Sequence, residues 1–432
     1  QRFGTFEKVR YQNFLVDKAA VYASEATGMN ISVGRISLSF PLNLVVTNVD
    51  AASPHNDTLL SVRRLQVNVQ LLPLLKKQVE VDGISLQGAT VNSNDLIHGM
   101  KLNGTLGELF ISSHGVALDP ETAIVNKVLL KDTDLSLCLN DTAAADTAAS
   151  DTAYWKIILQ DIDLQNVSFA LDMPLDSLSL AASLDNATLR DGLIDLHKSA
   201  YSLQTFRIEN GRVRYDNGKP LAADSLSSGL DPSHIALTDI GVKLDSLYYG
   251  GRNMKAIISQ FVLKERSGVE IVSATGRMVS NDKVLRVPSL KLETRDSYLE
   301  LNAAMDWNAL DFKDEGLVSA RLMADIGKPD VVRFMGSMDE KFIRQYPSEP
   351  LRIRTGIDGD LNKLKLTTLT AELPGALGLF ARGELTHLTD SLLRGGDITL
   401  EAETKDLKFV STLAEGIEIP YGTRLEGKFT MA

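Results

Sequence analysis

The sequence predicts a mainly β protein: an elongated, curved, taco-like β-sheet groove with an N-terminal amphipathic helix and a second short helix. Three observations predict this fold. Apolar and polar residues alternate in run after run from residue 30 onward, which is the period of a half-buried strand. Apolar residues at helical spacing occupy one stretch near the N-terminus. Pairs of polar or glycine residues interrupt several strand patterns at their middle.

The amphipathic helix is predicted within a leading segment of residues 1–29. Its apolar residues follow the i, i+3, i+4 spacing, and Gly28 stands where a C-terminal glycine would end the helix. Phe14, Leu15 and Tyr22 are expected to cap the open apolar end of the first strands. A helix this short cannot cover the whole apolar face of the strands that follow. Another part of the protein or a ligand must therefore cover the rest of that face.

Residues 30–139 are predicted to form a first β-groove unit. One of its strands places Leu65, Val67, Val69 and Leu71 on one face and polar residues on the other. The strands resume over residues 154–328 as further groove repeats.

Two-residue interruptions divide strands at Gln87–Gly88, Gln165–Asn166 and Pro288–Ser289. The apolar residues stay on one face only if the strand is bulged or bent there, and repeated bends would curve the sheet into a trough. Tight turns in an ordinary β-sandwich would give the same pattern, so both interpretations stay open. With a bulge at Gln165–Asn166, one face would hold Ile162, Leu164, Val167 and Phe169.

Residues 140–153 form a low-complexity stretch that is predicted to be an exposed, flexible loop. Asp-Thr-Ala occurs three times in it, and the triplet resembles the acceptor sequence of periplasmic O-glycosylation in Bacteroidetes. Thr142, Thr147 and Thr152 would then carry glycans. A plain linker is the alternative.

Residues 329–432 repeat the order of helix followed by strands. A short helix is predicted from Pro329, because proline suits the first turn. Residues 350–388 are interpreted as four short strands, and the last repeat is expected to be truncated.

Composition argues against several classes of protein. The net charge of −11 disfavours nucleic acid as a partner, and the single cysteine, Cys138, excludes an internal disulfide. The histidines are scattered, and no phosphate-binding, dinucleotide-binding or nucleophile-elbow motif occurs. The close acidic pairs Asp132/Asp134, Asp161/Asp163 and Asp358/Asp360 suit turns and strand edges. We therefore expect no enzyme, no cofactor and no metal site.

The predicted apolar face is aliphatic, since aromatic residues make up only 6% of the chain. Leucine, isoleucine and valine suit acyl chains, which need apolar area and no hydrogen bonds. A closed protein core would use the same residues, so the sequence leaves an open groove and a filled core as alternatives.

Residues 18–92 resemble the N-terminal region of the TamB/AsmA-like envelope proteins. They contain that family's helix ending in Thr-Gly, its V-x-G-x-V/I strand, and D-T-L-L followed by a basic pair. The matching positions are Thr27, Gly28, Val33, Gly34, Ile36, Asp57, Thr58, Leu59 and Leu60. Later strands and residues 329–388 resemble the family's repeats, so the resemblance covers most of the chain.

The resemblance implies a Bacteroidetes-type TamB that bridges the periplasm of a Gram-negative envelope. It implies an inner-membrane anchor before Gln1 and a BamA-like outer-membrane barrel partner, met through a domain beyond Ala432. The family is associated with phospholipid transport and with outer-membrane protein assembly or secretion, so phospholipid is the expected ligand of the apolar rows. A scaffold that pairs strand edges with client strands, and a surface glycan-binding or adhesive β-array, stay open as alternatives.

Overall fold

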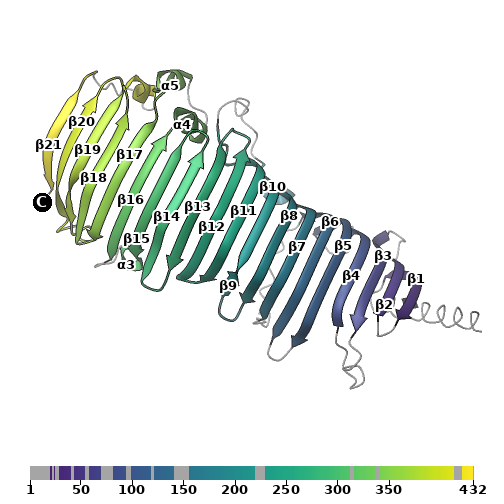
Figure 1. Ribbon diagram of the computed structural model, residues 1–432. Helices are drawn as coiled ribbons and strands as arrows, with labels where there is room; N and C mark the ends of the chain where they lie inside the picture. The colour runs from purple at the N-terminus through teal and green to yellow at the C-terminus, as the bar shows by residue number, and fades with distance from the viewer. Residues whose placement is uncertain are drawn as a thin grey trace, which may run out of the picture. The chain divides into compact units, whose positions relative to one another are not determined.

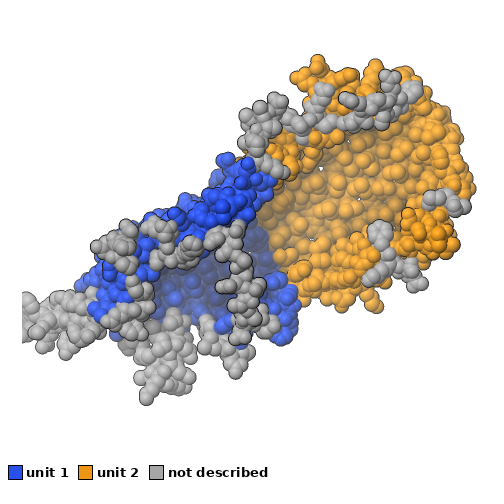
Figure 2. Space-filling model, turned by 180° about the vertical axis from the view of Figure 1, so that it is seen from behind, with its two compact units in different colours: residues 1–219 blue, residues 220–432 orange. Residues whose placement is uncertain are grey.

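The computed structural model is mainly β and divides into two compact units, residues 1–219 and residues 220–432 (Figures 1 and 2). The mainly β prediction is thus confirmed. The residues that the structure describes are 20–21, 24, 29–39, 43–53, 58–69, 81–93, 99–117, 121–140, 155–218, 229–311, 316–335, 340–412 and 421–431. The five-part division expected from the sequence stays a prediction.

Unit 1 is a single sheet. Its strands are β1 (Asn30–Ser39), β2 (Asn43–Ala52), β3 (Thr58–Val69), β4 (Val81–Asn92), β5 (Met100–Ala117), β6 (Thr122–Leu139), β7 (Lys156–Met173), β8 (Leu178–Asp195), β9 (Ala200–Leu203) and β10 (Thr205–Asp216), with the 3-10 helix η1 (Pro174–Asp176) before β8. Neighbours pair antiparallel from β1 to β6 and again from β7 to β8. Both β9 and β10 pair with β8, and only Gln204 separates them.

β6 and β7 pair in parallel. Parallel strands need a crossover of about a dozen residues or more, which residues 140–155 supply. The low-complexity stretch forms most of this connection. Its predicted glycosylation positions, Thr142, Thr147 and Thr152, lie outside the described residues.

Left-handed residues mark a bend line across the strands of unit 1. Asn48, Gly88, Asp132, Asn166 and Asn210 have φ of 54°, 62°, 49°, 52° and 53°. The pairing register skips one position at the first four of them and two positions at Asn210. Glycine, asparagine and aspartate tolerate this conformation best, which explains why they occupy the line. The interruptions predicted at Gly88 and Asn166 are confirmed.

Unit 2 is an antiparallel meander from β11 to β21 (Figure 1). Its strands are β11 (His234–Gly250), β12 (Asn253–Glu265), β13 (Glu270–Ser280), β14 (Val284–Thr294), β15 (Tyr298–Asp306), β16 (Leu317–Ile326), β17 (Leu351–Asp360), β18 (Lys363–Leu373), β19 (Leu377–Thr386), β20 (Gly395–Thr404) and β21 (Arg424–Met431). The interruption predicted at Pro288–Ser289 is a register shift between Val287 and Leu290.

Short helices accompany the meander of unit 2. They are α3 (Trp307–Leu310), α4 (Lys328–Phe334), α5 (Glu340–Gln345) and the 3-10 helix η2 (Lys408–Thr412). The short helix predicted from Pro329 is confirmed as α4, with the proline in its first turn. The prediction of four short strands over residues 350–388 is wrong, because β17, β18 and β19 are three longer strands.

The amphipathic helix predicted near the N-terminus falls mostly outside the described residues. Ala20, Val21 and Ser24 are helical. The Ser24 hydroxyl oxygen accepts a hydrogen bond from the Ile31 backbone N–H at 3.0 Å, which ties this segment to the start of β1. The predicted cap residues Phe14, Leu15 and Tyr22 lie outside the described part of the chain.

Candidate functional site

Two continuous rows of apolar residues cross nine strands of unit 1. Residues that pair directly on neighbouring strands share a face of the sheet. The Leu65 row consists of Ile36, Val46, Leu65, Leu86, Leu109, Leu130, Leu164, Ala187 and Ile208, and the Val67 row of Leu38, Leu44, Val67, Ile84, Ile111, Val128, Ile162, Leu189 and Phe206. Sequence residues almost 100 positions apart, Leu65 and Leu164, therefore lie in one row.

Two further rows lie beyond the bend line. They contain Val33, Val49, Val62, Ala89, Leu106, Thr133, Val167 and Leu184, and then Ile31, Ala51, Leu60, Val91, Gly104, Leu135, Phe169, Ala182 and Val213. Val167 pairs with Thr133 and Leu184, and Phe169 pairs with Leu135 and Ala182; their predicted place on one face with Ile162 and Leu164 stays a prediction. Val69 pairs with Val81, but its side chain is not described, and Leu71 lies outside the described residues.

A polar row runs beside the bend line. It consists of Arg35, Thr47, Arg64, Gln87, Glu108, Lys131, Gln165, Asn186 and Glu209. Each member is adjacent in sequence to a member of the Leu65 row, so its side chain points to the opposite face. The two faces of the sheet therefore differ beside the bend line, although the next row on the polar side, that of Gln66, includes Val45, Phe110 and Leu129.

The apolar rows of unit 1 are only partly covered. Leu65, Val67, Ile162, Leu164 and Val167 are half-buried. Leu38 keeps 66% of its surface exposed and Phe169 keeps 38%. The buried apolar side chains in the described part of unit 1 are Ala51, Leu59, Val62, Ala89 and Ala187. A closed sandwich would bury its inner rows fully between two sheets, whereas most described members of these rows keep part of their surface accessible.

Unit 2 carries an apolar row across all eleven of its strands. This Phe261 row consists of Val242, Phe261, Ala274, Leu292, Leu299, Ala324, Ile353, Ala371, Leu379, Ala402 and Leu425. Aliphatic side chains predominate, with alanine at four positions.

Two hydrophobic clusters lie at opposite ends of the strands that carry this row. One joins helix α5 and η2 to the β18–β19 turn through Phe342, Tyr346, Leu373, Ala376, Leu407 and Phe409. The other joins α3 to the β17–β18 turn through Ala309, Val318 and Leu361. The helical segments therefore pack at the strand ends, while row members such as Ile353, Leu379 and Ala402 between the clusters stay half-buried.

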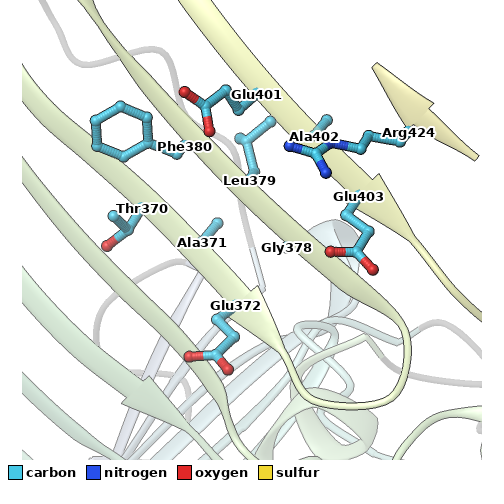
Figure 3. A pocket seen from close by; sticks show the side chains of 10 residues that line it. All are labelled: Thr370, Ala371, Glu372, Gly378, Leu379, Phe380, Glu401, Ala402, Glu403 and Arg424. Atoms are coloured by element: carbon cyan, nitrogen blue, oxygen red, sulfur yellow. The ribbon is translucent and has the colours of Figure 1, made fainter. Parts of the chain in front are cut away.

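An open pocket of about 350 Å³ lies on β18 to β21, and the Phe261-row residues Ala371, Leu379 and Ala402 are part of its lining (Figure 3). Glu372, Gly378, Glu403 and Arg424 are direct partners across these strands, and no atom lies within 4 Å of where a Cβ of Gly378 would be. Its charged side chains alternate along the strands with Phe261-row residues and so face away from that row. Two of them form ion pairs: a guanidinium nitrogen of Arg352 lies 3.7 Å from the Glu372 carboxylate, and one of Arg424 lies 3.4 Å from the Glu426 carboxylate.

The acidic pairs singled out in the sequence have structural partners. Arg190 forms ion pairs with both Asp161 and Asp163. The Asp132 carboxylate accepts a hydrogen bond from the Asn166 amide at 2.9 Å, and the Asp360 carboxylate accepts two from the turn that follows it. Within the described residues, no group of three or more histidine, cysteine or acidic side chains is placed to hold a metal ion.

No protein-family model matches the chain, and no curated protein does either. The resemblance to the TamB/AsmA-like family therefore stays a prediction. No helix among the described residues is long and apolar enough to cross a membrane.

Proposed function

We propose that this chain is part of a TamB-like envelope protein that carries phospholipid along curved, groove-like apolar sheet faces. The observation that carries the proposal is the pair of apolar rows in unit 1. They continue across nine strands without a polar interruption, yet most of their members are only half-buried, and only Ala187 among their described members is fully buried.

Acyl chains are the ligand that these rows fit best. Each methylene group removed from water contributes about 0.8 kcal/mol, and an acyl chain requires no hydrogen-bonding partner. The Leu65 row is entirely aliphatic, whereas stacking of sugars would call for aromatic side chains. The left-handed residues of the bend line, which lie on β2, β4, β6, β7 and β10, favour a trough, and unit 2 is hollowed on the side seen in Figure 2.

The cellular setting follows from the family resemblance alone. We propose a periplasmic location with an anchor in the inner membrane, a BamA-like barrel as partner, and a supporting role in outer-membrane protein assembly or secretion. We propose no catalytic activity, since the acidic pairs serve the fold. Transport by a passive apolar surface needs no reacting group.

Charge placed on the apolar rows tests the proposal. The variants Val67→Asp and Leu164→Asp should fold but retain little phospholipid on purification, because a half-buried carboxylate stays hydrated and repels an acyl chain. Lipid extraction with mass spectrometry measures the phospholipid, and thermal unfolding measures the fold. Gln66→Asp changes the opposite face and should leave the lipid content unchanged.

Val62→Asp is the matched control for burial, because Val62 lies in the same strand and exposes only 5% of its surface. It should cost several kcal/mol of stability, on the order of 3 kcal/mol or more. If Val67→Asp unfolds the protein as readily as Val62→Asp and the wild-type protein contains no lipid, the face is an ordinary core. Specific binding on a glycan array would then favour the adhesive alternative.

A further inference from the structure

Four exposed leucines surround one of the two hydrophobic clusters of unit 2. Leu310, Leu317, Leu392 and Leu393 expose 42%, 61%, 92% and 62% of their surfaces. We call them the leucine rim. Leu310 follows the buried Ala309 of α3, and Leu317 precedes the buried Val318 of β16. Leu392 and Leu393 belong to the β19–β20 loop, which packs Leu388 against the same cluster.

The loop that presents Leu392 and Leu393 is held by its own hydrogen bonds. The backbone N–H groups of His387 and Leu388 donate to the carbonyls of Asn362 and Leu361 at 3.0 and 2.8 Å. The Leu392 N–H donates to the Asp390 carboxylate at 2.8 Å, and the Arg394 guanidinium donates to the Leu388 carbonyl at 2.9 Å. The two leucines are thus displayed to solvent by an ordered turn.

The hydrophobic cluster beside the leucine rim is continuous with the apolar sheet face. Val318 lies six residues before Ala324 of the Phe261 row on a strand with no register shift, so both point to one face. Val318 is paired with Met305 on β15, and both belong to the cluster around which the rim is arranged. An apolar surface therefore leads from the sheet to the cluster beside the rim, while Leu317, next to Val318 on the strand, points to the other face.

The size and charge of the rim indicate its partner. Four leucine side chains fall well short of the roughly 1,200 Å² that a specific protein–protein interface buries. Insertion into a bilayer needs no matching surface and gains from each apolar side chain that leaves water. Two of the cations nearby are neutralised by acidic partners, since Lys363 pairs with Glu384 at 3.0 Å and Arg252 with Asp311 at 3.0 Å.

We propose that the leucine rim docks unit 2 on the surface of a lipid bilayer, with Leu392 and Leu393 inserted among the lipids. Docking there would bring the end of the apolar sheet face to the membrane, where lipid could pass between the two. The inference deepens the proposed function and rests on it. Because Lys363 and Arg252 are paired with acidic residues, neutral lipid suffices for binding.

Flotation with phosphatidylcholine vesicles tests the inference. The full chain should float with the vesicles, and the double variant Leu392→Ser/Leu393→Ser should lower the bound fraction about tenfold, because it removes the inserted apolar area. Leu175→Ser is the matched control, since Leu175 lies in η1 of unit 1 and is 62% exposed like Leu393. It should float like the wild-type chain. Such exposed substitutions should leave the fold intact.

Equal flotation of the double variant and the wild-type chain, or no flotation of either, would overturn the docking inference. The inference would also be overturned if the double variant floated like the wild-type chain but no longer formed a dimer. That result would identify a second copy of the chain as the partner. Phospholipid that co-purifies with the double variant separates the two proposals. If the wild-type chain and the double variant both contain phospholipid but neither floats with the vesicles, the proposal of docking by the leucine rim is rejected and the proposal of phospholipid binding stands.

Discussion

Asn166 holds a backbone conformation that most residues avoid. Its φ is 52°, and its side-chain amide donates to the Asp132 carboxylate, itself on a left-handed residue of the bend line. Residues with a branched Cβ are strained in this region by about 1–2 kcal/mol. Glycine tolerates it without strain. The residue type at this position therefore decides how easily β7 bends.

We expect Asn166→Val to unfold at lower denaturant concentration than Asn166→Gly. The difference in free energy of unfolding should be about 1–2 kcal/mol, because both variants lose the hydrogen bond to Asp132 and only valine adds backbone strain. Ser168→Val, two residues along the same strand, is the control and should cost little. Equal unfolding midpoints for the valine and glycine variants would show that the left-handed bend is not required.

Asp231 stabilises unit 2 in a pH-dependent way. Its carboxylate accepts hydrogen bonds from the Ser233 backbone N–H and interacts with the His234 ring, both at 2.9 Å. The Ser233 hydrogen bond, followed by His234, lowers the pKa of Asp231 below its ordinary value of 3.8. Since the folded state then holds its proton less tightly than the unfolded chain, the stabilisation is present above pH 3.8 and lost as the pH falls through the folded pKa.

Asp231→Asn should therefore destabilise the protein near pH 7 and do so progressively less below about pH 4. Denaturant unfolding of both proteins at several pH values measures this. A difference in stability that stays constant down to about pH 2 would contradict the assignment, because it would show that the carboxylate charge does not contribute.

At the scale of elements, the sequence predicts what depends on local chemistry. The bends at Gly88 and Asn166 could be found because a two-residue polar insertion would otherwise turn the following apolar residues to the wrong face. Helix α4 could be found from Pro329 and the apolar pair that follows. The same reasoning placed Leu65, Val67, Ile162 and Leu164 on strands, but only the pairing registers join them into two shared rows.

Contacts between residues far apart in the sequence could not be predicted from it. The parallel pairing of β6 with β7 depends on a crossover that leaves no periodic pattern. The contacts that hold α4 against the sheet could not be predicted either. Asp330 is 1% exposed and accepts hydrogen bonds from the hydroxyl groups of Thr294 and Ser297 at the β14–β15 turn. It also forms an ion pair with Arg333 at 3.1 Å. These partners lie more than 30 positions from Asp330 in sequence, except Arg333, so no spacing rule connects them.

At the scale of the whole molecule, both units follow one plan. Each is a sheet crossed by continuous apolar rows, and polar or charged residues alternate with many members of those rows along the strands. Unit 2 adds hydrophobic clusters at the strand ends, where short helices pack. The central claim is that the rows are open surfaces for acyl chains. Whether lipid lies on the rows is therefore the most direct question to ask.

A photoreactive amino acid placed at single positions answers it. Positions 67 and 164 lie in the Val67 and Leu65 rows, whereas positions 66 and 163 are their sequence neighbours on the opposite face. After irradiation of protein in a membrane-containing extract, mass spectrometry should find phospholipid attached at Val67 and Leu164 and little at Gln66 and Asp163. Equal capture at all four positions, or none at Val67 and Leu164, would contradict the account.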